Sequence, residues 1–189
     1  MIEVSQVANL PSIYGDFDIK AYKEAGSEHL AIMSKNFSSL KQPLLRIHSE
    51  CVTGDTLGSL KCDCANQLHL ALELIAKEGG LVVYHRQEGR NIGLLNKVNA
   101  YALQDQGLNT IEANIALGFE PDERTYDVIP FILKDLHVQQ VKLITNNPLK
   151  IEVVKKCAKV VQRIPAITDI NDHNRCYIDT KKTKMGHML

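Results

Sequence analysis

Short apolar runs and alternating positions predict several strands along the chain. Polar and apolar residues alternate from 16 to 22, directly after the turn-rich residues 10–15, and this alternation predicts a strand with one buried face. Three further runs of apolar and β-branched residues predict strands at 44–48, 81–84 and 141–144. Because the first forty residues are the richest in strand signals, we expect a mixed sheet and not a purely parallel one.

Helical spacing of apolar residues predicts helices between these strands. From 66 to 77, Leu68, Leu72 and Ile75 fall on one side of a helix, and the glycine pair 79–80 ends it. Further helices are predicted at 91–106, at 126–136 with an interruption near the start at Pro130, and from Pro148 onwards. Helices that alternate with short β-branched strands are typical of an α/β domain.

Length and composition agree with this fold class. The chain has 189 residues, of which 44% are hydrophobic and 23% charged, as in an ordinary globular protein. We therefore expect a single α/β domain over residues 1–189, with a mixed β-sheet flanked by helices. The basic and polar C-terminal end, about 170–189, is expected to be partly mobile.

Charge and the absence of targeting signals limit the classes of partner. The chain has 22 basic and 22 acidic residues, so its formal net charge is zero. Proteins that wrap long nucleic acid usually carry a basic excess, so we expect no nucleic-acid partner and only local anion binding, for which Arg86 and Arg90 are candidates. No signal peptide is visible, and no apolar run approaches the roughly 20 residues that span a membrane. These features predict a cytoplasmic protein without a membrane partner.

Three of the five cysteines lie close together in the sequence, at Cys51, Cys62 and Cys64. In a reducing compartment, such crowding favours metal binding or catalysis over disulfides. Three thiolates hold zinc well and leave a fourth position for the water that a catalytic zinc requires. The spacing fits a structural zinc equally well, with a histidine as the fourth ligand. Three histidines are candidates for that position: His48, His69 and His85.

Polar side chains lie next to this cluster in the sequence. In a strand, Arg46, His48 and Glu50 would share one face, and an exposed, solvated face is the plainer interpretation of that pattern. The stretch from Tyr84 to Gly93 favours a binding site, because a buried strand ends there in a polar loop with two glycines that opens a helix. In α/β sheets, ligands bind where strands end and helices begin, and helix N-termini and arginines suit phosphates.

Two later segments carry further candidate residues. Asp122 and Arg124 are two positions apart, so an extended backbone would place them on one face, and a weak surface ion pair is the alternative. Thr145 and Lys150 lie on either side of a predicted strand-to-helix turn. Their hydroxyl and ammonium groups suit a phosphate, although an ordinary helix cap explains that turn equally well.

Taken together, these segments resemble GTP cyclohydrolase II, the enzyme family that opens riboflavin biosynthesis. Single segments are weak signals, but their combination and order are specific, and the resemblance runs from Leu10 to His187. The matching segments are 46–51, 53–55, 59–64, 84–94, 101–105, 122–124, 145–148, 180–181 and 184–187. Ala65 follows Cys64 where the family usually has glycine, a departure that can alter the turn but leaves every ligand in place.

The resemblance implies a set of site residues. It implies that Cys51, Cys62 and Cys64 bind one catalytic Zn²⁺ per subunit. The positions that match GTP-contacting residues of the family are Arg46, Ile47, His48, Ser49, Glu50, Gln67, Glu88, Gly89, Arg90, Thr110, Thr145 and Lys150. The positions that match catalytic residues are Asp122 as the proton acceptor, Arg124 as the nucleophile at the α-phosphate, and Tyr101 at the active site.

The resemblance also implies the reaction. A homodimer would hydrolyse GTP to a diaminopyrimidinone ribosylamine phosphate, formate and pyrophosphate, with Mg²⁺ assisting at the triphosphate. Arg124 is an uncomfortable nucleophile because the pKa of a guanidinium lies above ~12, so a protonated charge clamp is the alternative role. The family often carries a dihydroxybutanone phosphate synthase domain. This chain has no room for one, so we expect a monofunctional enzyme.

Two other classes of function fit part of the pattern. One is a zinc-stabilised nucleotide-binding module without catalysis, but the presence of Asp122, Arg124 and all three cysteines argues against it. The other is a nucleobase deaminase, a class with a Cys-x-x-Cys pair and a nearby His-x-Glu. Here the pair is Cys-x-Cys, and residues 48–50 match His-x-Glu only nominally.

Overall fold

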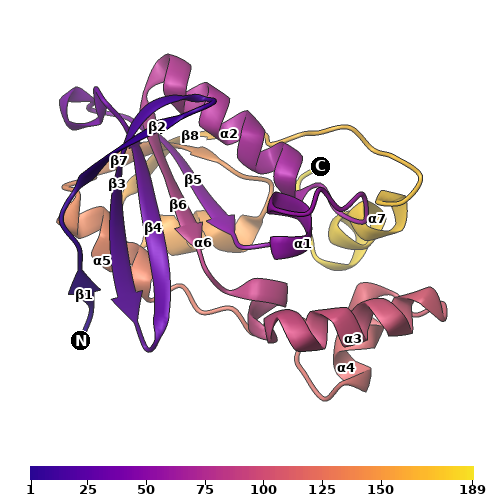
Figure 1. Cartoon of the computed structure of the whole chain (residues 1–189). Coiled ribbons are helices and arrows are strands. Elements are labelled where there is room, and N and C mark those ends of the chain that lie inside the picture. Colours follow the sequence, from indigo (N-terminus) through magenta and orange to yellow (C-terminus); the bar gives the residue numbers. More distant parts are fainter.

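The structure is a computed structural model that describes residues 1–189, and it centres on one mixed β-sheet (Figure 1). The strand order is β1 (Glu3–Val4), β3 (Gly15–Glu24), β4 (Ser27–Ser34), β6 (Gly80–His85), β5 (Leu44–Ser49), β7 (Gln140–Ile144) and β8 (Lys159–Ile164), and β2 (Ala8–Ser12) pairs with β3. The pairs from β1 to β6 are antiparallel, whereas β6–β5, β5–β7 and β7–β8 are parallel. The predicted α/β class with a mixed sheet is confirmed.

Helices cover both faces of the sheet and gather at one end of it (Figure 1). On one face, α2 (Cys64–Glu78) packs Leu72 and Ile75 into a core with Phe17 and Leu44. The opposite face carries the larger core, which α5 (Val128–Asp135) and α6 (Pro148–Lys155) cover. The other elements are η1 (Phe37–Ser39), α1 (Val52–Asp55), η2 (Glu88–Asn91), α3 (Gly93–Asp105), α4 (Thr110–Ala116) and α7 (Arg175–Lys184). None of the helices has the length and apolar composition to cross a bilayer.

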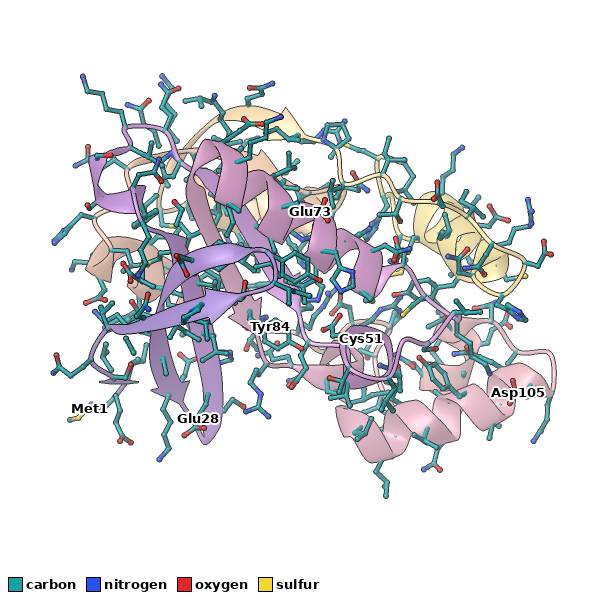
Figure 2. The ribbon with its side chains drawn as sticks, turned by 45° about the horizontal axis from the view of Figure 1, so that its top comes forward. Met1, Glu28, Cys51, Glu73, Tyr84 and Asp105 are labelled. Carbon is teal, nitrogen blue, oxygen red and sulfur yellow. The ribbon has the colours of Figure 1, made fainter.

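The carboxyl ends of β5, β6 and β7 meet at one edge of the sheet, because these three strands are parallel. There β5 continues into α1, β6 into η2, and β7 into the turn before α6. Figure 2 shows Cys51, which lies two residues after the end of β5, at this edge and away from Glu28 in the β3–β4 hairpin. Three chain segments are thus available to build a site at the expected place.

The two faces of β5 carry different side chains. Leu45 and Ile47 lie in the larger core, whereas Arg46 and His48 lie on the side of α2 and are only 5% and 1% exposed. The interpretation of 46–50 as an exposed, solvated face is therefore wrong for Arg46 and His48. Neighbouring elements cover this face, and polar groups buried in this way need hydrogen-bond partners.

Several elements differ from the sequence expectations at their ends. Helix α5 begins at Val128, two residues later than expected, and Pro130 lies in its first turn, where a missing N–H breaks no helical hydrogen bond. Helix α3 begins only at Gly93, because Arg90 and Asn91 have positive φ values. Helices α4 and α7 and strand β8 were not predicted from the sequence. Although 175–184 form a helix here, the mobility of 170–189 stays a prediction.

Candidate active site

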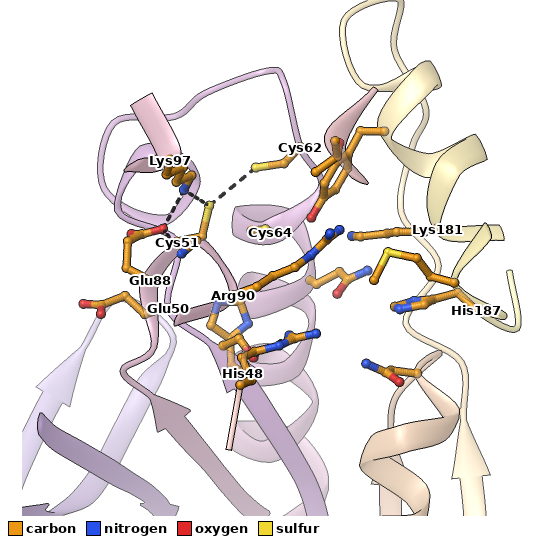
Figure 3. A pocket seen from close by; sticks show the side chains of 18 of the residues that line it. His48, Glu50, Cys51, Cys62, Cys64, Glu88, Arg90, Lys97, Lys181 and His187 are labelled. Carbon is orange, nitrogen blue, oxygen red and sulfur yellow. Dashed lines mark hydrogen bonds and ion pairs between the residues drawn. The ribbon is translucent and has the colours of Figure 1, made fainter. Parts of the chain in front are cut away.

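A cavity opens at the carboxyl edge of the parallel strands (Figure 3). Every site residue expected from the sequence lines it except Ile47, whose side chain lies in the core, and Asp122, which lies behind Arg124. The cavity thus brings together residues from β5, η2, α3, α4 and α6 and from the segment 51–64, which carries the three cysteines and is called the thiol loop below. Lys97, Asn114 and Tyr177 also line the cavity and were not predicted from the sequence, whereas Lys181 and His187 lie in segments that match the family but had no predicted role.

The three cysteines form one cluster at the cavity wall. The Sγ atoms of Cys51, Cys62 and Cys64 all lie within 4.8 Å of one another, and those of Cys51 and Cys62 are 3.7 Å apart. Cys51 caps α1 and Cys64 opens α2, so the loop between these helices closes around the sulfurs. Gly54 makes room for them, since a Cβ there would lie 2.9 Å from Cys62 Sγ and 3.2 Å from Cys51 Sγ.

The chemistry of this donor set fits a soft divalent cation. Hydrogen bonds from Cys62 and Cys64 lower the pKa of Cys51, and the same coupling to Cys51 raises the pKa of Cys62 to about 11. Three sulfurs this close therefore do not all ionise without a cation to offset their charges. Zinc removes this cost and prefers thiolate ligands.

None of the three histidines considered as a fourth ligand joins the cluster. His48 Nε2 faces Asp55, and the ring of His69 lies against Tyr14 with centroids 5.5 Å apart. The ring of His85 is stacked between those of His29 and Tyr126. The chain thus offers three ligands, which is the number in sites that keep an open position.

A buried ion pair supports the thiol cluster. Lys97 Nζ donates to Cys51 Sγ at 3.1 Å and to Glu88 Oε1 at 2.7 Å (Figure 3). Glu88 also accepts from the backbone N–H groups of Val52 at 2.6 Å and Gly89 at 2.8 Å. Its carboxylate therefore holds the thiol loop and η2 in place. The resemblance implies only a GTP contact for Glu88, so this supporting role was not predicted.

The helical spacing of Lys97 relative to Tyr101 would have predicted that both side chains lie on the same face of α3. Lys97, Tyr101 and Gln104 are spaced at i, i+4 and i+7 on α3, and all three line the cavity. The hydroxyl groups of Tyr101 and Thr53 form a hydrogen bond of 3.1 Å, in which either can be the donor. Thr53 Oγ1 also lies next to Cys51 Sγ. Tyr101 thus lies beside the thiol cluster, as the resemblance implies.

The carboxylate of Asp55 joins β5, β6 and the thiol loop. His48, whose pKa is lowered by burial, donates from Nε2 to both Asp55 oxygens at 3.1 Å. Tyr84 Oη donates at 2.8 Å and the backbone N–H of Cys51 at 3.0 Å. Since three donors from three segments converge on one buried carboxylate, Asp55 fixes the direction in which the chain leaves β5.

Cationic side chains dominate the cavity although the whole chain is neutral. Seven lysines and arginines line it against two glutamates. Lys150 Nζ has only Ile47 O at 3.0 Å and Ser49 Oγ at 3.1 Å as partners, and burial followed by repulsion from Arg124 and Arg46 depresses its pKa. A buried ammonium without a carboxylate is poised for an anionic ligand.

Two buried nitrogen atoms at the cavity have no hydrogen-bond partner within the protein. Arg46 Nε and His48 Nδ1 are buried and make no hydrogen bond, and both side chains line the cavity. Arg86, in contrast, does not line it: its side chain is 47% exposed and pairs with Glu50 Oε1 at 3.0 Å. Of the two arginines expected to bind an anion, only Arg90 reaches the cavity.

Arg124 and Asp122 form a two-pronged pair that is mostly buried. Arg124 Nε donates to Asp122 Oδ1 at 2.8 Å, and Nη2 donates to Oδ2. Burial alone would lower the pKa of Arg124, but the hydrogen bonds and charge of Asp122 outweigh it and raise the pKa. With exposed side-chain fractions of 9% and 21%, this is not the weak surface pair considered as an alternative.

A strained turn positions this pair. Gly89, Arg90 and Asn91 have φ values of 60°, 61° and 74°, and such strain in non-glycine residues is typical of functional sites. The turn is attached to the segment before Arg124, because Glu123 N–H donates to Arg90 O at 3.1 Å. Arg90 and Arg124 are therefore placed by one local structure.

We predict that Asp55→Asn lowers the free energy of unfolding by about 2 kcal/mol, because an amide loses the charge and turns its own donors toward two of the three incoming donors. Urea denaturation measures this change. Asp105→Asn is the control, since Asp105 forms an exposed ion pair with Lys61, and its change is expected to stay below about 0.5 kcal/mol. Equal effects of the two substitutions would contradict the assigned role of Asp55.

Comparison with known proteins agrees with the site. The sequence profile of the family described as GTP cyclohydrolase II matches residues 3–165. A GTP cyclohydrolase-2 from Campylobacter fetus subsp. fetus is 57% identical over 98% of this chain and 95% of the relative. Similar proteins of that name from Campylobacter hominis and Helicobacter pylori are each 53% identical over 100% of this chain, covering 96% and 98% of the relatives. The chain therefore belongs to the GTP cyclohydrolase II family.

Proposed function

We propose that this protein hydrolyses GTP to a diaminopyrimidinone ribosylamine phosphate, formate and pyrophosphate, the first step of riboflavin biosynthesis. The observation that carries the proposal is that a cluster of three thiols and a group of buried cationic side chains line the same cavity. The first suits a metal and the second a triphosphate. Membership in the GTP cyclohydrolase II family supports the combination.

The thiol cluster is proposed to hold one zinc ion per chain through Cys51, Cys62 and Cys64. When bound, zinc supplies an activated water for attack on the guanine carbon that leaves as formate. Lys97 compensates part of the thiolate charge through its hydrogen bond to Cys51. Tyr101 lies next to the cluster through Thr53, and it is the candidate for moving protons there.

The remaining cavity residues are proposed to hold the nucleotide. Arg46 and His48 offer unpartnered nitrogens, and Gln67 fixes Arg46 through its amide oxygen. Ile47 contributes through its carbonyl, which holds Lys150. The other contacts are assigned to the expected lining residues: Ser49, Glu50, Glu88, Gly89, Arg90, Thr110 and Thr145.

Phosphate chemistry is assigned to Arg124, with Asp122 as its partner and proton acceptor. The bidentate pair keeps the guanidinium in one orientation, and its raised pKa means that attack on the α-phosphate requires Asp122 to accept the proton. As the N–P bond forms, the bond from the α-phosphorus to the pyrophosphate oxygen breaks, and water later cleaves the N–P bond to release the nucleotide product. Arg90 and Lys150 offset the charge of the departing pyrophosphate. Magnesium would be held mainly by the phosphate oxygens, and Glu50 is the lining carboxylate that keeps an oxygen free of donors.

The proposal also includes a homodimer in the cytoplasm. Leu94, Leu95 and Val98 lie on the outer side of α3 and are 43%, 76% and 53% exposed. An apolar helix face of this kind, with a second copy of the chain as its occupant, would explain why these side chains remain uncovered in one chain.

The direct test is to incubate the purified protein with GTP and Mg²⁺ and to quantify formate and pyrophosphate together. We expect both products in equal amounts, because one cavity carries both functional groups. Protein with its metal removed by a chelator serves as the control and is expected to release no formate. Zinc-loaded protein that produces neither compound would contradict the proposal.

Gly54→Ala is expected to displace the sulfurs and to reduce both bound zinc and formate production in parallel, since the added methyl group would meet Cys62 Sγ and Cys51 Sγ. Metal content by mass spectrometry and a formate assay measure the effect. Gly58→Ala is the matched control, because a Cβ there meets nothing within 4 Å and the left-handed φ of 66° adds only local strain. Full zinc content in Gly54→Ala would argue against the assigned cluster.

Arg124→Ala is expected to reduce pyrophosphate release by about 100-fold or more, because the variant lacks the guanidinium that is proposed to attack the α-phosphate. Rapid-quench measurement of pyrophosphate from GTP tests this. Lys134→Ala removes the same charge from the exposed side of α5 and should release pyrophosphate at the normal rate. A normal rate in Arg124→Ala would remove this residue from the mechanism.

A further inference from the structure

The C-terminal segment, residues 175–189, forms one wall of the cavity, although the family profile ends at residue 165 and none of the roles assigned above falls on it. Tyr177, Lys181, Met185 and His187 line the cavity. Figure 3 shows Lys181 and His187 reaching into it from the side opposite Glu88 and Cys51. The sequence match at 180–181 and 184–187 therefore has a structural counterpart that the proposed function does not yet use.

Two attachments hold this segment against the site. Lys181 Nζ donates to Asp63 Oδ1 at 2.6 Å, and Asp63, which is 2% exposed, is the residue between Cys62 and Cys64 in the sequence. At the far end, Met188 N–H donates to Asn146 O at 2.9 Å in the turn between β7 and α6. The segment thus spans the cavity from the thiol loop to the turn that carries Thr145 and Lys150.

His187 shares the cavity wall with four cationic side chains. Lys181 of α7, Lys150 of α6, Arg124 and Arg90 line the same cavity as His187, and burial, followed by repulsion from these four charges, lowers the pKa of His187 to about 4. Burial is the larger cause, and the four positive charges add to it. A polyphosphate would supply negative charge that offsets the positive charges around the neutral imidazole.

We propose that Lys181 and His187 bind the triphosphate of the substrate, and that His187 takes up a proton from solvent when the phosphates enter. This inference rests on the proposed function and extends it to a segment without an assigned role. The arriving negative charges cancel the repulsion from the four cations, so the imidazolium becomes the favoured form and donates a charge-assisted hydrogen bond to a phosphate oxygen. Lys181 contributes its remaining donors beyond the one that Asp63 accepts.

Calorimetric titration with inorganic pyrophosphate tests this on the zinc-loaded protein at pH 7, in two buffers that differ in ionisation enthalpy. The difference between the buffers reports the protons taken up on binding. We expect His187→Gln to weaken pyrophosphate binding by about tenfold or more and to reduce the proton uptake, while KM for GTP rises more than kcat falls. Lys182→Ala, an exposed neighbour on α7, is the control and should bind pyrophosphate normally.

Lys181→Ala is a second variant, but it also releases Asp63 beside the thiols, so His187→Gln decides the matter. Unchanged affinity and unchanged proton uptake in His187→Gln would overturn the proposal. Loss of zinc in that variant would assign His187 a structural role and overturn it as well. Failure of the unchanged protein to form formate from GTP would instead contradict the proposed function, so the two failures are distinguishable.

Discussion

The buried carboxylate of Asp55 is the point on which the site depends. It accepts hydrogen bonds from His48 on β5, from Tyr84 on β6 and from the N–H of Cys51. A buried charge needs such partners, so these three hydrogen bonds fix the positions of β5, β6 and the thiol loop relative to one another. The position of Cys51, and with it the closure of the thiol loop, follows from this constraint.

A second polar network connects other residues of the cavity wall. Arg46 donates to Gln67, Gln67 donates to Asp63, and Asp63 also accepts from Lys181. The network connects β5, α2, the thiol loop and the C-terminal segment, which lie far apart in the sequence. Since its members are buried or half-buried and hydrogen-bonded to one another, a substitution of one is expected to affect the others. Hydrogen bonds therefore connect the proposed metal-binding and phosphate-binding parts of the cavity.

The strongly patterned elements of the fold were predictable from the sequence. The strands at 44–48, 81–84 and 141–144 and the helix at 66–77 were found because burial on one or both faces imposes a hydrophobic pattern. The start of α3 was not predicted correctly. Arg90 and Asn91 have positive φ values there, and both side chains contact the segment 121–123, which is distant in the sequence. The break expected at Pro130 does not occur, because the position of a proline within a helix depends on where that helix begins.

By itself, the sequence determined the α/β class, the family, the three cysteines and most of the residues that line the cavity, because each of these depends on residue type and order. Only the tertiary structure decided that Arg46 and His48 are buried, that Arg86 lies outside the cavity and that Lys97 contacts Cys51. The same holds for Lys181 and His187, which approach the thiols and Lys150 from the far end of the chain. Such contacts join residues that are distant in sequence, and packing of the whole chain sets them.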